Sequence, residues 1–149
     1  MFIFNRIVFF SMALLLLNSC SKNDDNISSD LTGNWRVIYF LENGNRITKS
    51  DENTWPNINN GDITANFTEP DGDGKGTVSG ITVSNMYSAE YTIQEAGKIS
   101  IGPIQTTLGN EPEWTQLFRL YLVENFENKS SRLLLYYNNR ESTIVFERK

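Results

Sequence analysis

Histidine is absent from this chain of 149 residues, and cysteine occurs once, at Cys20. Without histidine the chain cannot form a Ser-His-Asp or Cys-His catalytic arrangement, nor an imidazole metal site. Glycine-rich phosphate loops of the Walker or dinucleotide type are also missing. Two carboxylates could still serve a glycosidase, but only at a defined separation within a cleft. We therefore predict a protein that is not an enzyme and has no cofactor or metal, with a carboxylate-based hydrolase as the less favoured alternative.

Positive charge is scarce relative to negative charge: 13 lysines and arginines stand against 18 aspartates and glutamates, a formal net charge of −5. Because an acidic protein without a basic cluster repels phosphate backbones, we exclude nucleic acid as a partner. The run Asp71-Gly72-Asp73-Gly74-Lys75-Gly76 begins like a calcium-binding loop, but Lys75 occupies a position that needs an oxygen ligand. We interpret this run as a tight hairpin turn.

Apolar runs long enough to span a bilayer as a helix, which takes about 20 residues, are missing as well. The longest apolar run, residues 7–17, follows Arg6 and has the length and position of a cleaved export signal. It ends in Leu17-Asn18-Ser19-Cys20, which resembles the lipobox of bacterial lipoproteins, although Asn18 stands where Ala, Ser, Thr or Val is usual. An ordinary secretory signal is the alternative.

The lipobox resemblance implies a lipoprotein signal peptide at residues 1–19 and lipid attachment at Cys20, which becomes the new N-terminus. Each buried methylene of an acyl chain contributes about 0.8 kcal/mol, so two or three chains anchor a protein to a membrane without a transmembrane helix. Acylation would also remove the liability of an unpaired thiol in an oxidising compartment. The predicted membrane contact is made through this anchor alone.

A polar segment, residues 20–30, comprises the acylated cysteine and a predicted flexible tether that has too few apolar side chains to fold. Ser21 stands where many inner-membrane lipoproteins have aspartate, which favours the outer membrane. Lys22 with Asp24 and Asp25 resembles the sorting tether that some Gram-negative lineages use to expose lipoproteins to the medium. A merely hydrophilic linker is the alternative. We predict an outer-membrane, lipid-anchored protein of the cell envelope and leave surface exposure open.

Residues 31–149 are long enough for one domain with a core and too short for two. Short β-branched and aromatic runs alternate with turns rich in Gly, Asn and Asp, which is typical of an antiparallel β domain. Asn43-Gly44 predicts a hairpin turn, because both residues tolerate positive φ angles. Strands are predicted at residues 32–41, 46–48, 62–68, 75–85, 87–95, 98–106, 132–137 and 142–148, with a loop over 50–61.

Helical spacing interrupts this pattern between residues 110 and 127, where apolar residues recur three or four positions apart. Asn110 with Glu113 resembles a capping box, and Pro112 is tolerated in a first turn. We predict one amphipathic α-helix over residues 110–127, before the last two strands. The predicted fold class is therefore mainly β: a small antiparallel β-barrel of about seven or eight strands with that single helix.

Two family resemblances agree with a barrel. Residues 98–148 resemble the C-terminal half of META-domain proteins, found in heat-inducible bacterial lipoproteins, in their threonines before a helix, their leucine strand and a last strand ending in Phe-x-Arg. Leu108-Gly109-Asn110 stands where many members have Met-Ala-Cys, so no cysteine role carries over. Gly33-Asn34-Trp35 resembles the Gly-x-Trp of lipocalins, whose tryptophan closes the barrel floor beneath a basic residue. That resemblance implies Arg148 for the basic residue, while the order of helix and strands favours the META-like arrangement.

These features predict a non-catalytic, membrane-anchored envelope lipoprotein that binds a small apolar ligand or a partner protein. An assembly scaffold with a filled barrel is the structural alternative. Trp55, in the 50–61 loop, is the candidate ligand-binding residue, because a loop aromatic can guard a barrel mouth. Folding back onto the core is the alternative for Trp55, and Trp35 and Trp114 are expected in the core. An apolar cavity of about 300 Å³ or more, reached from that loop, would favour ligand binding.

Overall fold

The computed structural model describes residues 27–28, 30–95 and 97–149. The predicted signal peptide, the lipid attachment site Cys20 and the predicted sorting residues Ser21, Lys22, Asp24 and Asp25 lie outside the described residues. Their roles stay predictions. Within the described part of the chain, no helix has the length and apolar character needed to cross a membrane.

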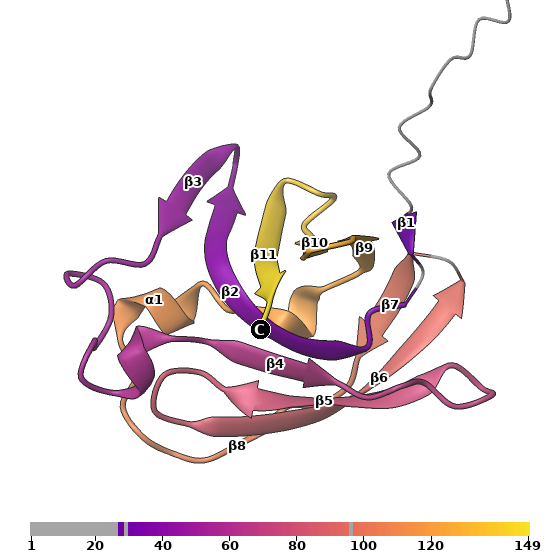
Figure 1. Cartoon of the computed structure of the whole chain (residues 1–149), viewed down its shortest axis with the longest axis horizontal. Coiled ribbons are helices and arrows are strands. Elements are labelled where there is room, and N and C mark those ends of the chain that lie inside the picture. Colours follow the sequence, from indigo (N-terminus) through magenta and orange to yellow (C-terminus); the bar gives the residue numbers. More distant parts are fainter. Residues whose placement is uncertain (1–26, 29, 96) are drawn as a thin grey trace, which may run out of the picture.

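A closed antiparallel β-barrel forms the domain (Figure 1). Eight strands make the ring in the order β9-β10-β11-β2-β4-β5-β6-β7, and the pairing of Lys98 with Asn125 joins β7 back to β9. This confirms the predicted mainly β fold class and its small antiparallel barrel. Across the described ranges the sheet has eleven strands, because β1, β3 and β8 pair outside the ring with β9, β2 and β6. The bounds are β1 Ile27–Ser28, β2 Gly33–Glu42, β3 Asn45–Thr48, β4 Thr64–Phe67, β5 Lys75–Ile81, β6 Met86–Glu95, β7 Lys98–Ile101, β8 Gln105–Thr106, β9 Asn125–Lys129, β10 Arg132–Tyr137 and β11 Ser142–Arg148.

The predicted turns form for the expected local reasons. Asn43 and Gly44 have φ angles of 50° and 80°, which the turn between β2 and β3 requires. In the hairpin between β4 and β5, the Asp71 carboxylate accepts the backbone N–H groups of Asp73 and Lys75, both at 2.9 Å. This side chain closes the turn itself, as Asp does in Asx turns, and the hairpin interpretation of residues 71–76 is confirmed.

Strand β1 lies inside the segment predicted as a flexible tether. Its two residues, Ile27 and Ser28, pair with Lys129 and Asn128 of β9. The Asn128 side-chain amide also donates to the Asp30 carbonyl at 2.5 Å. Because backbone pairing needs no apolar side chains, the polar composition of the segment did not reveal it. The ordered domain therefore begins a few residues earlier than predicted.

The helix predicted over residues 110–127 is wrong in its extent. The structure has a short helix α1, Glu113–Gln116, a 3-10 turn η2, Leu120–Leu122, and then β9, so three strands follow the helix. The capping prediction is also wrong, because Pro112 is the N-cap residue and makes no side-chain cap hydrogen bond. Strand β9 pairs with both β7 and β10, and this long-range pairing outweighs the local helical spacing.

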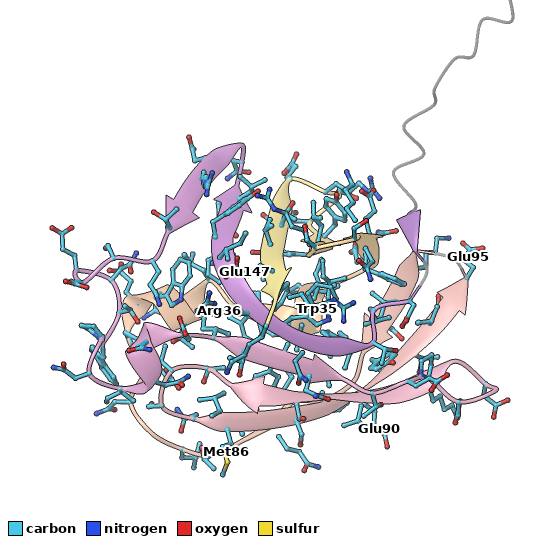
Figure 2. All side chains as sticks on the ribbon, viewed as in Figure 1. Trp35, Arg36, Met86, Glu90, Glu95 and Glu147 are labelled. Atoms are coloured by element: carbon cyan, nitrogen blue, oxygen red, sulfur yellow. The ribbon has the colours of Figure 1, made fainter. Side chains whose placement is uncertain are left out.

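Large side chains fill the barrel interior, as the sticks in Figure 2 show. Trp35 and Trp114 are both fully buried there, as predicted, and the Trp114 ring packs edge-on against Phe40 with 4.6 Å between centroids. The other large, fully buried side chains are Tyr91, Tyr137, Phe67, Phe126, Phe146, Leu31, Ile63, Leu120 and Leu133. A barrel of eight strands is narrow enough for its own side chains to fill it.

The Gly-x-Trp segment contacts the basic residue that the lipocalin resemblance named, Arg148. The Trp35 indole N–H donates to the Leu31 carbonyl at 2.9 Å, and the Arg148 guanidinium lies over the Trp35 ring at 4.4 Å from its centroid. Gly33 has a φ of +132°, and a Cβ there would lie 2.6 Å from Arg148 Nη1. Glycine is therefore needed at this position for both backbone conformation and space.

Antiparallel strands place the hairpin turns alternately at the two ends of the barrel. The β4–β5, β6–β7 and β9–β10 turns share one end with β1, which we call the N-terminal end (Figure 1). The β5–β6 and β10–β11 turns lie at the opposite end, which we call the distal end. Any membrane anchor upstream of β1 would therefore approach the N-terminal end.

Candidate functional site

A shallow apolar groove lies at the distal end of the barrel, between the β5–β6 turn and the segment that carries α1. We call it the rim groove, and its volume is about 340 Å³. This size is at the lower end of small-molecule sites. Its lining residues are Thr82, Asn85, Tyr87, Ile104, Thr106, Thr107, Leu108, Gly109, Glu111, Thr115, Phe118 and Tyr121.

The apolar wall of the rim groove is built from rings that continue into the core. Phe118 contacts Tyr87 edge-on at 5.4 Å between centroids and Phe146 at 6.3 Å. Leu108 is 99% exposed and Tyr121 is 61% exposed, although both are large apolar side chains that line the groove. Met86, at the start of β6, is 63% exposed and lines an adjoining hollow with Thr106 and Thr107 (Figure 2). Because exposed apolar side chains around a hollow are typical of interaction sites, the rim groove is the candidate site.

The polar wall is organised by the Glu111 carboxylate. It accepts hydrogen bonds from the Thr82 hydroxyl at 2.6 Å, from the Asn85 backbone N–H at 2.8 Å and from the Thr115 hydroxyl at 2.9 Å. The Ser84 N–H and the Asn85 side-chain amide also donate to it. Burial pushes the pKa of Glu111 upward, but these hydrogen bonds outweigh burial and hold the pKa below its ordinary value. Glu111 is therefore ionised at neutral pH.

The Asn85 side chain is also occupied within the protein. Its amide nitrogen donates to the Gly109 carbonyl at 3.0 Å, and its oxygen accepts the Thr107 hydroxyl at 2.9 Å. The Tyr87 hydroxyl donates to the Thr64 carbonyl at 2.8 Å. Since these polar groups are already bonded, what the groove offers a ligand is chiefly apolar surface.

Two other hollows fit an apolar ligand less well. One, of about 680 Å³, lies at the N-terminal end, and its lining includes the acidic residues Asp30, Glu69 and Glu95. A second of about 340 Å³ lies where Asn53 meets α1, and its lining includes the charged residues Glu113 and Arg119. Among the described residues, no group of three or more His, Cys, Asp or Glu side chains is placed to hold a metal ion.

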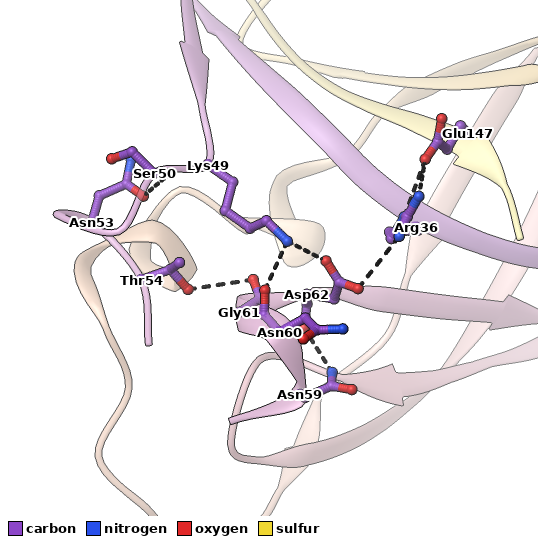
Figure 3. A network of polar contacts seen from close by, with 10 residues as sticks. All are labelled: Arg36, Lys49, Ser50, Asn53, Thr54, Asn59, Asn60, Gly61, Asp62 and Glu147. Atoms are coloured by element: carbon purple, nitrogen blue, oxygen red, sulfur yellow. Dashed lines mark hydrogen bonds and ion pairs between the residues drawn. The ribbon is translucent and has the colours of Figure 1, made fainter. Parts of the chain in front are cut away.

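Trp55 does not line the rim groove. It is 36% exposed in the 50–61 loop, where Ile58 is 43% exposed, and its proposed ligand role stays a prediction. The loop is tied to the barrel through Asp62, which pairs with Lys49 at 2.5 Å and Arg36 at 3.6 Å (Figure 3). Arg36 pairs in turn with Glu147 of β11. These contacts fix the base of the loop and leave Trp55 outside the groove.

Sequence reasoning did not single out Glu111, Asn85 or Tyr121 as site residues. Leu108 was noticed only as a departure from the META-domain pattern, and that departure lies in the groove wall. The one signal in the sequence that could have pointed here is a single leucine, Leu108, within the otherwise polar stretch of residues 105–110. The other residues are brought together only by the fold.

We expect the folded domain to lose stability at high pH, because several tyrosine hydroxyls are shielded from solvent. Burial and the hydrogen bond to Glu127 raise the pKa of Tyr136 to about 12, and burial also raises the pKa of Tyr87 and Tyr137. A raised folded-state pKa means that stability is complete below the unfolded pKa of about 10 and falls as the pH approaches about 12. We expect urea unfolding to show this decline, and the decline to be shallower in Tyr136→Phe. A stability independent of pH over this range would contradict it.

Comparison with known proteins gives a fold and no family. Neither a protein-family model nor a curated protein matches the sequence. The crystal structure of a DUF4847 family protein from Bacteroides vulgatus matches with a TM-score of 0.57 at 16% sequence identity, over 79% of this chain and 93% of that one. At this level of identity the likeness concerns the barrel fold alone.

Proposed function

We propose that this protein is a non-catalytic, lipid-anchored protein of the bacterial outer membrane that binds a small apolar ligand in the rim groove. The export signal and the lipobox-like Leu17-Asn18-Ser19-Cys20 support the anchor. The resemblance of residues 98–148 to META-domain lipoproteins supports an envelope role. The leucine strand and the Phe-x-Arg strand of that resemblance form β10 and β11.

The observation that carries the proposal is the rim groove itself. Leu108 and Tyr121 expose apolar surface beside a hollow of about 340 Å³ whose polar groups are bonded to one another. Burying such surface stabilises a complex by about 25 cal/mol per Å². A compact apolar ligand can fill a hollow of this volume. A protein partner would need a much wider contact surface, because a stable protein interface buries about 800 Å² per partner.

The placement of the groove agrees with an anchored binding protein. Strand β1 enters at the N-terminal end, and the rim groove opens at the distal end. A tether from Cys20 to β1 would hold the N-terminal end toward the bilayer. The groove would then face away from the membrane and be open to molecules in solution.

Replacing Leu108 with serine tests the groove. We expect the domain to bind the neutral dye N-phenyl-1-naphthylamine and Leu108→Ser to weaken binding by about 10-fold or more, because a buried leucine contributes about 1.5–3 kcal/mol. Leu108 is exposed in the free protein, so the fold should be unaffected. Ile58→Ser is the matched control, since Ile58 is an exposed aliphatic residue away from the groove. Equal weakening by both substitutions would contradict the assignment.

The filled interior favours one alternative, an assembly scaffold that binds no small molecule. Native mass spectrometry of protein extracted from its own membrane separates the two functions. A co-purifying small molecule supports ligand binding. Absence of any small molecule, together with failure to bind the dye, would leave the scaffold as the better description. A co-purifying protein that is lost in Leu108→Ser would indicate instead that the groove binds a protein.

A further inference from the structure

Val83, in the turn between β5 and β6, has a backbone conformation that valine rarely adopts. Its φ is 109°, and its side chain is buried. For a β-branched residue, a positive φ is a genuine outlier, and it persists only where the surrounding structure enforces it. Some neighbouring group must therefore hold this turn in place.

Glu111 is the group that holds it. The residues on both sides of Val83 donate to its carboxylate: the Thr82 hydroxyl and the Asn85 N–H, at 2.6 and 2.8 Å, and the Ser84 N–H at 3.2 Å. Glu111 lies 26–29 residues further along the chain, in the segment that forms the opposite wall of the rim groove. The Ser84 hydroxyl adds a bond to the Asn110 carbonyl at 2.6 Å, which joins the same two segments.

We propose that Glu111 is a positioning residue of the rim groove, whose carboxylate clamps the strained 82–85 turn to the 107–115 segment and so sets the shape of the binding site. This inference rests on the proposed function. Glu111 acts through its neighbours, since its oxygens are taken up by five donor groups of the protein. Releasing the clamp lets the turn leave its strained conformation, and the two walls then lose their spacing.

Two substitutions of Glu111 should affect the turn differently, because they keep different numbers of its hydrogen bonds. In Glu111→Gln, the amide oxygen can still accept from Thr82 and Asn85, and the amide nitrogen can donate to the Thr115 hydroxyl, which also accepts. In Glu111→Ala, every one of these hydrogen bonds is lost. The clamp therefore predicts that glutamine retains most of the ligand affinity and that alanine does not.

The test measures dye affinity and local opening in parallel. With N-phenyl-1-naphthylamine, we expect Glu111→Ala to bind about 10-fold more weakly or worse, and Glu111→Gln to remain within about 3-fold of the unmodified protein. Glu113→Ala is the matched control, because it removes an exposed carboxylate two residues away. Hydrogen exchange at the Ser84 and Asn85 amides should accelerate in Glu111→Ala while the amides of β10 and β11 stay protected, which distinguishes local release from global unfolding.

The possible results separate the clamp from the function on which it rests. If the unmodified protein does not bind the dye, the proposed function fails. If it binds and Glu111→Ala binds equally well, with unchanged exchange at Ser84 and Asn85, the clamp is wrong and the function stands. If Glu111→Ala does not fold, Thr82→Val replaces it, because it removes the bonds of the Thr82 hydroxyl to Glu111 at 2.6 Å and to the Asn85 carbonyl at 3.2 Å and leaves the other donors to Glu111 in place. Weaker binding with faster exchange at Ser84 supports the clamp, and unchanged binding and exchange overturns it.

Discussion

Replacing Trp35 with alanine should lower the free energy of unfolding by about 3–5 kcal/mol, as expected for a large aromatic removed from a packed core. Trp35 is fully buried, donates to the Leu31 carbonyl and lies beneath the Arg148 guanidinium. The substitution leaves a cavity at the N-terminal end and removes the partner of each of these groups. Since whole domains have only about 5–15 kcal/mol of stability, this substitution should remove a large share of it.

Urea unfolding followed by far-ultraviolet circular dichroism measures the loss. Trp55→Ala is the matched control, because it removes the same side chain from a loop position that is 36% exposed. Its effect should be well under half that of Trp35→Ala. Equal losses from the two substitutions would contradict the core position of Trp35.

Replacing Cys20 with serine should abolish lipid attachment completely. The serine hydroxyl cannot take the place of the thiol that the lipobox resemblance assigns to acylation, and the chain has no second cysteine. We expect cells fed radiolabelled palmitate to label the unmodified protein and not the Cys20→Ser variant. The variant should also be lost from the outer-membrane fraction, because the acyl chains are the predicted membrane contact.

Ser21→Ala provides the control for the anchor. It alters the neighbouring residue and keeps the thiol, so labelling should persist. Undiminished labelling of Cys20→Ser, or no labelling of the unmodified protein, would overturn the lipoprotein assignment. The dye-binding test of the rim groove uses the folded domain, so its result does not depend on the result of the anchor test.

Most strands of this barrel were predictable because their signals are local. Alternating burial along β4 follows directly from period two in the sequence, and Asn43-Gly44 supplied its turn through positive φ angles. The Trp35–Arg148 contact was also predictable, through the Gly-x-Trp resemblance. The strand alternation, the Asn43-Gly44 turn and the Gly-x-Trp segment can each be recognised within a few consecutive residues.

The helix prediction fails between residues 117 and 127 for the opposite reason, because the structure there depends on distant residues. Phe118, Leu122 and Phe126 have helical spacing, yet Phe126 lies in β9 and faces the core of a closed ring. Strand β9 forms because β10 and β7 offer it backbone partners on both sides, and one of those strands precedes it by more than twenty residues. A local pattern carries no information about that partnership. The same applies to Ile27–Ser28, whose partner strand lies about a hundred residues away.

A predicted location in the cell envelope and a fold class can be read from the sequence alone, since an export-signal pattern, a lone cysteine and alternating strands are recognised by composition and short-range spacing. The rim groove could not be read this way. Thr82, Asn85 and Glu111 become neighbours only when the β5–β6 turn meets the segment before α1, and Leu108 is known to be exposed only once the barrel has closed. The burial of each side chain and the distances between side chains depend on all strands of the ring together. The rim groove is therefore formed only by the tertiary structure.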